Sequence, residues 1–183
     1  MIRRTAVAVL TVTALLLSGG AAVAYTHGSL RPAGAHKTSG LAALRQAMGR
    51  YRNLQRAENA GYELFTDAKG VACIAMPGMG GMGVHFVKGS LVGDPAEHVR
   101  QPEALVYRIN KKGVLTLAAA EYVVLKKAWD ATHSSPPTLF GHVFMSTPAG
   151  NRYGLPAFYS LHAWAWYHNP AGNFAMWNPR VKC

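Results

Sequence analysis

The chain has 183 residues, of which 50% are hydrophobic and 15% are charged. This balance is typical of a folded protein with its own core and argues against a disordered chain. Lys and Arg outnumber Asp and Glu by 19 to 8, but the basic residues are scattered and do not alternate with aromatic ones, so we expect no nucleic-acid binding.

The first 24 residues have the pattern of a secretory signal peptide. Arg3 and Arg4 precede an apolar run over 5–17, and Ala22-Val23-Ala24 offers a small-residue cleavage site. The apolar run is too short to span a bilayer and no later run is long enough, so we expect no transmembrane segment. The pattern predicts a protein secreted to the cell envelope or the medium. There its positive charge would favour loose contact with an anionic cell-surface polymer, although a charged soluble surface is the simpler explanation.

An amphipathic helix is predicted after a polar arm. Residues 25–40 are rich in Gly, Ser, Thr, Pro and His, and we interpret them as a flexible arm. A stripe with helical spacing follows and predicts a helix over 41–59, which ends at Ala60-Gly61. The stripe consists of Leu41, Leu44, Met48, Tyr51 and Gln55.

Short β-forming runs between turn residues continue to the C-terminus. Asn110-Lys111-Lys112-Gly113 predicts a hairpin turn between two of them. We therefore predict an α+β fold in a single domain over 41–183, with the N-terminal helix packed on a mainly antiparallel sheet of five or six strands. The candidate strands are 62–65, 71–76, 84–87, 103–109, 114–125, 139–145, 158–168 and 174–177.

The segment 151–179 holds three of the four tryptophans and the most unusual histidine. Its run 158–168 is apolar on both faces, which is typical of a strand covered on both sides. A turn at Asn169–Gly172 and a short return strand would close a hairpin. His162 lies inside the apolar run, either as a core histidine with a backbone partner or as a buried ligand or acid/base group.

The two cysteines, Cys73 and Cys183, form an even pair in a chain with a predicted export signal. In an oxidising compartment such a pair indicates a disulfide. Closing so long a loop would stabilise the fold by about 4 kcal/mol in the chain-entropy description. A two-cysteine metal site is the alternative, but neither cysteine has neighbours at a zinc spacing.

A first candidate metal site lies in the glycine-rich loop 76–83. Met76, Met79, Met82 and His85 recur at every third position. Thioether sulfur suits copper(I), and imidazole suits copper in either oxidation state. Methionine is also an ordinary gap-filler of cores, so packing explains the same pattern without a metal.

A second candidate is His27, which becomes the third residue if the signal is cleaved after Ala24. An N-terminal amine, two amides and an imidazole then form a square-planar nitrogen site for copper(II) or nickel(II). This site depends on the cleavage position, because a shift of one residue removes it.

A third candidate combines five ionisable side chains that fall in or beside apolar runs. Burying such groups is costly unless they pair or bind a metal. If their strands are neighbours, carboxylates and imidazoles converge on a zinc, iron or copper centre or on a metal-free acid/base site. Otherwise each group finds its own partner. The five are His85, Glu103, Glu121, His142 and His162.

Several segments resemble a group of small exported bacterial proteins of unknown function. These segments are GGMGVHFV, PEALVYRI and the C-terminal block LHAWAWYHNPAGNFAMWNPRVKC. The resemblance covers about 41–183 and implies an exported single domain. It assigns no activity and no functional residue.

Two functions follow as hypotheses. The first is an exported metal-binding protein in which His85 and His162 are the principal ligands, with copper expected and zinc or iron as alternatives. The second is a metal-free binding domain that uses the aromatic strand as a platform for a small ligand or a surface partner.

Overall fold

The computed structural model describes residues 33–183, with side chains described from residue 40 onward. The predicted signal peptide and His27 lie outside this range. Within the described residues, no helix combines the length and the apolar character needed to cross a membrane.

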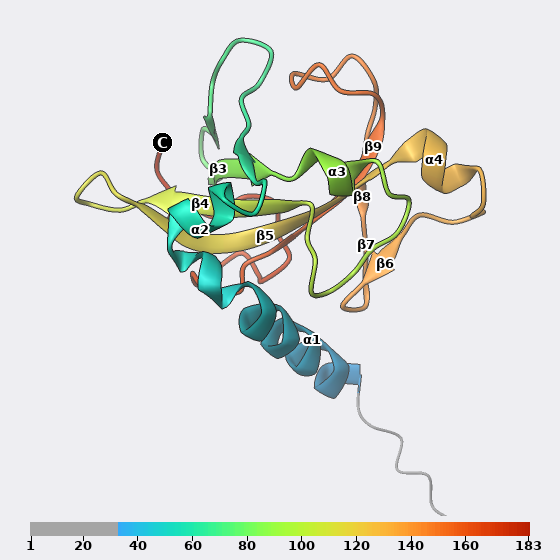
Figure 1. The fold of residues 1–183 in the computed structure, drawn as a ribbon, viewed down its shortest axis with the longest axis horizontal. Coiled ribbons are helices and arrows are strands. Elements are labelled where there is room, and N and C mark those ends of the chain that lie inside the picture. The colour runs from blue at the N-terminus through green and yellow to red at the C-terminus, as the bar shows by residue number, and fades with distance from the viewer. Residues whose placement is uncertain (1–32) are drawn as a thin grey trace, which may run out of the picture. The chain divides into compact units, whose positions relative to one another are not determined.

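The described residues form the predicted α+β fold around a seven-stranded sheet (Figure 1). The strands of this sheet are β1 (Glu63–Leu64), β2 (Cys73–Met76), β3 (Gly80–Val87), β4 (Ala104–Ile109), β5 (Leu115–Leu125), β8 (Met145–Thr147) and β9 (Phe158–Ala163). A separate hairpin contains β6 (Thr138–Leu139) and β7 (His142–Val143). The helical segments are α1 (Ala33–Met48), the 3-10 turn η1 (Gly49–Arg52), α2 (Leu54–Glu58), α3 (Gly89–Val92) and α4 (Lys126–Asp130).

The main sheet is antiparallel at each of its pairings, in the order β1-β3-β4-β5-β9-β8, with β2 also paired to β3. Strands β3, β4 and β5 follow one another along the chain. The predicted hairpin between β4 and β5 is confirmed, and the Gly113 amide donates to the Asn110 carbonyl at 2.9 Å in its turn. β9 comes from much later in the sequence and pairs with the long central strand β5.

The helical segment covers one face of the sheet. Leu44, Met48 and Tyr51 are buried as the helical stripe predicted, and they share a core with Tyr107 and Tyr122 of the sheet. The Tyr107 hydroxyl donates to the Tyr51 carbonyl at 2.6 Å. This face is therefore the main core, and the opposite face is left for other contacts.

The helix differs from its predicted bounds at both ends. It begins at Ala33, within the predicted arm, where Ala35 and Lys37 favour helix. It then breaks at Gly49 into a 3-10 turn. Asn53 restarts it by accepting the Arg56 amide at 3.3 Å, as an N-cap does.

Several predicted strands also need correction, and the predicted strand 158–168 ends at Ala163. β3 begins at Gly80, so half of the predicted glycine-rich loop is strand. The predicted strand 139–145 is interrupted by a turn, since Phe140 and Gly141 both have positive φ. The turn at Asn169–Gly172 is confirmed, but 174–177 forms no return strand. Trp164 instead donates its indole N–H to the Ala175 carbonyl at 2.6 Å.

The predicted disulfide joins Cys73 and Cys183, with a Cα–Cα distance of 5.5 Å. It fastens the C-terminal segment across β3, where Gly81 and Asn178 form a β-bridge. Gly80 is required at this crossing, because a Cβ on it would lie 2.1 Å from the Asn178 carbonyl oxygen.

Candidate metal centre

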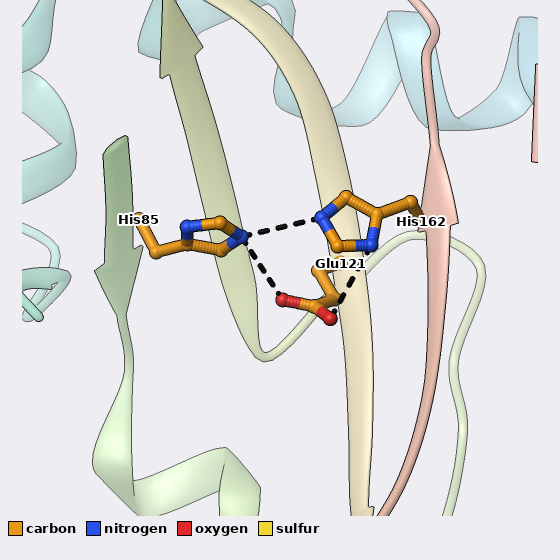
Figure 2. Close-up of side chains that lie close together, drawn as sticks. All are labelled: His85, Glu121 and His162. Atoms are coloured by element: carbon orange, nitrogen blue, oxygen red, sulfur yellow. Dashed lines mark hydrogen bonds and ion pairs between the residues drawn. The ribbon is translucent and has the colours of Figure 1, made fainter. Parts of the chain in front are cut away.

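Three buried side chains from three different strands meet on the sheet face opposite the helices (Figure 2). They are His85 on β3, Glu121 on β5 and His162 on β9. Glu121 and His162 are direct cross-strand partners. Antiparallel pairing therefore brings the carboxylate and one imidazole together on the same face without any loop.

His85 reaches the other two across the intervening strand β4. Neighbouring strands lie about 4.8 Å apart, so side chains two strands apart must span roughly 10 Å between their backbones. His and Glu are long enough to do so if nothing bulky stands between them. Ala104 of β4 is the cross-strand partner of Glu121, is fully buried, and carries only a methyl group. The β4 residue directly opposite His85 is Val106, so His85 approaches Glu121 diagonally, on the side where the small Ala104 leaves room.

The donor atoms of the three residues are close to one another. His85 Nε2 lies 3.1 Å from Glu121 Oε2 and 3.3 Å from His162 Nε2. His162 Nδ1 lies 3.4 Å from Glu121 Oε1. Donors bound to one ion at about 2.0–2.2 Å lie about 3.0–3.5 Å from one another. The two distances from His85 Nε2 fall in this range, and one donor atom from each of the three residues lies within 4.8 Å of the others.

The same atoms also form a consistent hydrogen-bonded set. If His162 Nδ1–H donates to Glu121, then His162 Nε2 carries a lone pair that points at His85 Nε2. A proton on His85 Nε2 can then be shared between His162 and Glu121. A metal ion could replace that proton, because loss of the proton gives His85 Nε2 a lone pair and leaves one donor atom on each of the three residues.

Burial and hydrogen bonding act on the charges in opposite directions. Burial disfavours the Glu121 carboxylate, but His162, His85 and the Ser160 hydroxyl outweigh it and hold the pKa of Glu121 well below its usual value. Burial lowers the pKa of His162 to about 4, so this ring is neutral near pH 7. Because a neutral His162 carries no charge, hydrogen bonds from His85 and Ser160 stabilise the carboxylate there. An anionic carboxylate beside a neutral imidazole is the state that binds a metal.

Glu103, a predicted ligand, lies apart from this group. Its neighbour Ala104 faces the cluster, so alternation directs Glu103 to the other face of the sheet. There its Oε2 accepts the Val123 amide at 2.9 Å. Burial raises the pKa of Glu103 to about 8.

His142 is also outside the group of three donors. It is half-buried in β7 of the separate hairpin, and its ring lies 4.3 Å from the ring of Phe174. It shares a small cavity lining with His162 but belongs to another sheet.

The three methionines of the loop occupy different environments. Met76 and Met79 are 42% and 47% exposed, whereas Met82 is buried. Met82 and His85 both line one cavity on the cluster face, and the lining includes neither of the other two. A bulge explains why residues three apart share a face: β3 carries Met82 as an extra residue between the partners of Ile74 and Ala75.

Sequence reasoning missed several residues around the cluster. Ser160 shares the face of His162 by alternation, which was visible in the sequence, but its role beside Glu121 was not predicted. Tyr153 and Met176 also line the cavity next to His85 and Glu121. Both come from irregular segments, where no periodicity indicates direction.

Two imidazoles and one carboxylate are a versatile ligand set. Catalytic zinc sites use three protein ligands and leave a fourth position for water or substrate. Two histidines and one carboxylate also bind non-haem iron with open positions. The cluster could therefore hold an ion with an open position toward the cavity.

Comparison with known proteins adds no assignment. No family model matches the chain, and no curated protein or solved structure matches it either.

Proposed function

We propose that this protein is an exported metal-binding domain whose His85, Glu121 and His162 bind one divalent transition-metal ion. The observation that carries the proposal is the approach of three buried donor atoms to within 4.8 Å of one another. Burying a carboxylate and two imidazoles together is costly unless a shared cation or proton satisfies them. A shared proton or one cation can fill this role, and a metal ion would satisfy all three donors at once.

Copper(II) is the ion that we expect to bind most tightly. Nitrogen and oxygen donors follow an affinity order in which copper exceeds zinc and iron. Met82, buried in the adjoining cavity, offers a soft sulfur that would also suit copper(I). Zinc or iron occupation is the competing outcome, because a two-histidine, one-carboxylate set serves both.

Export is proposed from the signal pattern in residues 1–24 and agrees with the Cys73–Cys183 disulfide, since such bonds persist in oxidising compartments. The excess of Lys and Arg supports weak attraction to an anionic cell-surface polymer as a secondary property.

The experiment is a metal titration of the exported protein by calorimetry, together with measurement of its metal content as purified. The background variant His27→Ala removes the competing N-terminal site. In that background, His85→Ala and His162→Ala are expected to abolish high-affinity binding of one ion per chain. His142→Ala is the matched control, because it removes an imidazole outside the three-donor group, and it should bind as the background does.

Retention of tight binding by both His85→Ala and His162→Ala would contradict the proposal. If metal binding is lost in the single variant His27→Ala, the metal binds at the N-terminus, and the proposal of a buried site is contradicted.

A further inference from the structure

A cavity of about 100 Å³ adjoins the cluster on the same face of the sheet. His85 and Glu121 form part of its wall, so a molecule inside it lies against the candidate metal centre. The remaining wall is almost wholly apolar and includes three aromatic rings. These rings belong to Phe65, Tyr153 and Phe158.

Two loops supply the outer wall of this cavity. Phe65 begins the segment after β1, and Tyr153 lies in the loop between β8 and β9; their ring centroids are 6.1 Å apart. An ion pair fastens the two loops, since Arg152 donates to Asp67 Oδ2 through Nη2 at 2.6 Å and through Nε at 3.1 Å. The Ala68 amide also donates to the Arg152 carbonyl at 3.0 Å. The two loops rise from the sheet as green-blue and orange segments in Figure 1.

The charge of the lining limits what can enter. The lining contains one carboxylate, Glu121, and no Lys or Arg. In the metal-free protein, an anion would find no positive partner among these side chains and would meet Glu121. A cation would have to compete with His85, His162 and Ser160 for a carboxylate that they already contact. An uncharged molecule has neither problem.

The volume limits the size. A dry apolar cavity of about 150 Å³ is known to hold a benzene molecule, so this one, at about two-thirds of that volume, suits about four non-hydrogen atoms as it stands and a ring of phenol size when the covering loops move outward. The polar atoms in the lining belong to His85 and Glu121 and to the hydroxyls of Thr147, Tyr153 and Ser160. A ligand therefore needs an apolar body and one polar group.

We propose that this cavity binds a small uncharged molecule with an apolar ring or branched body and a single hydroxyl-type polar group directed at His85 and Glu121. The inference rests on the proposed metal site for the role of that polar group, which would take the open position on the ion. The fit of the apolar body depends only on the cavity. The cavity thus defines a class of substrate or ligand for the same site.

The test uses phenol as the probe, with benzene lacking the hydroxyl and benzoate carrying a charge. Binding to the full exported protein is followed by ligand-observed NMR and calorimetry, with and without the metal. Phenol should bind one site per chain and more tightly than benzene, and benzoate should not bind the metal-free protein. In the wild-type protein, NMR should show contacts between the phenol protons and the rings of Phe65 and Tyr153. This measurement does not depend on the folding of any variant.

Ala72→Leu narrows the cavity, because Ala72 is half-buried in its lining. It is expected to weaken phenol binding by roughly tenfold or more, since excess volume is poorly accommodated in a packed site. Ala75→Leu is the matched control on the same strand region, because Ala75 is exposed and outside the lining. Thermal unfolding of both variants checks that they remain folded.

The results separate this inference from the metal proposal. If the protein takes up no metal and yet binds phenol, with Ala72→Leu weakening that binding, the cavity proposal is supported and the metal proposal is contradicted. If the protein takes up metal but binds neither phenol nor benzene, the cavity proposal is contradicted and the metal proposal is supported. Equal phenol binding by Ala72→Leu and wild type, without contacts to Phe65 or Tyr153, also overturns the inference.

Discussion

Glu121 and His162 stand directly opposite each other on β5 and β9, and Glu121 Oε1 lies 3.4 Å from His162 Nδ1. The backbone ladder itself holds this carboxylate and imidazole together. His85 is different, because it must reach them across β4. The cluster thus has a fixed pair and a third member whose approach depends on the space above β4, and two predictions separate these contributions.

Glu121→Gln tests the charge of the fixed pair. The amide keeps the shape of the side chain but loses the negative charge that a divalent ion needs, so metal affinity should fall by roughly a hundredfold or more. The dissociation constant is measured by competition with a chelator. Glu103→Gln is the matched control, because it makes the same substitution at another buried acidic side chain, on the opposite face, and should leave metal affinity unchanged. Equal losses in both variants would show that the effect is general destabilisation.

Ala104→Val tests the space that His85 crosses. Ala104 lines the same cavity wall as His85 and Glu121, so we expect the added methyl groups to crowd these two side chains and weaken metal binding. The added volume also destabilises the fold by about 1–3 kcal/mol. Ala163→Val is the control, since Ala163 is equally buried beside His162 but faces the helical core. It should destabilise similarly and bind metal normally, as judged by urea unfolding and calorimetry.

The sequence identified the three residues of this cluster as candidates, but it did not show which of the candidates lie together. His85, Glu121 and His162 were all candidates because each interrupts an apolar strand. Glu103 met the same criterion, yet it lies on the other face. The face on which a side chain lies depends on the register of its strand, because a shift of one residue moves every side chain to the other face. The alternation around Glu103 alone could not settle that register.

The fold was predictable where signals were local. The hairpin β4–β5 and its Asn110–Gly113 turn follow from adjacent residues. The pairing of β9 with β5 joins segments that are distant in the chain, and no turn chemistry specifies it. The bulge at Met82 is likewise tertiary, since Gly83 takes positive φ where a Cβ would lie 2.7 Å from the Tyr107 carbonyl oxygen. These features fix the face of Met82, so the loop spacing alone could not predict which methionine joins His85.

Glu103 should make the stability of the protein depend on pH. Burial raises its pKa to about 8, from an ordinary value of 4.5. The folded state holds this proton more tightly than the unfolded chain, so its stabilisation is fully present below about pH 4.5 and is lost as the pH rises through 8. We expect the free energy of unfolding to fall by roughly 2–4 kcal/mol between pH 5 and pH 8.5 from this group.

Urea unfolding of wild type and Glu103→Gln at both pH values measures this difference. The Gln variant should lack the contribution of Glu103, because it cannot ionise. Glu58→Gln, an exposed carboxylate on α2, is the control and should keep the wild-type dependence. An identical dependence in Glu103→Gln and wild type would contradict the assignment.

The Cys73–Cys183 disulfide should contribute strongly to stability, because it closes a loop with a sequence separation of 110. Replacing both cysteines with Ala should lower the free energy of unfolding by about 4–5 kcal/mol. Denaturant unfolding measures the loss, and mass spectrometry before and after reduction reports the bond. Metal affinity should persist in the folded variant, because neither cysteine belongs to the three-donor group. Two free thiols in the purified wild-type protein would contradict the pairing.

The Asp67–Arg152 ion pair should control the mobility of the loops that cover the cavity. Arg152 donates the hydrogen bond that holds the pKa of Asp67 below its usual value, and Asp67 Oδ1 also accepts the amides of Lys69 and Val71 at 2.9 Å. Arg152→Met keeps the apolar stem but removes both hydrogen bonds to Asp67 Oδ2. We therefore expect faster amide hydrogen exchange at Ala68, Lys69 and Val71, because these amides then open more often. Amides of the central strand β5 should be unaffected, since the ion pair lies outside the main core.

Arg56→Met, which removes an exposed guanidinium from α2, is the control and should leave the loops protected. Unchanged exchange at the three loop amides in Arg152→Met would show that other contacts hold the cover closed.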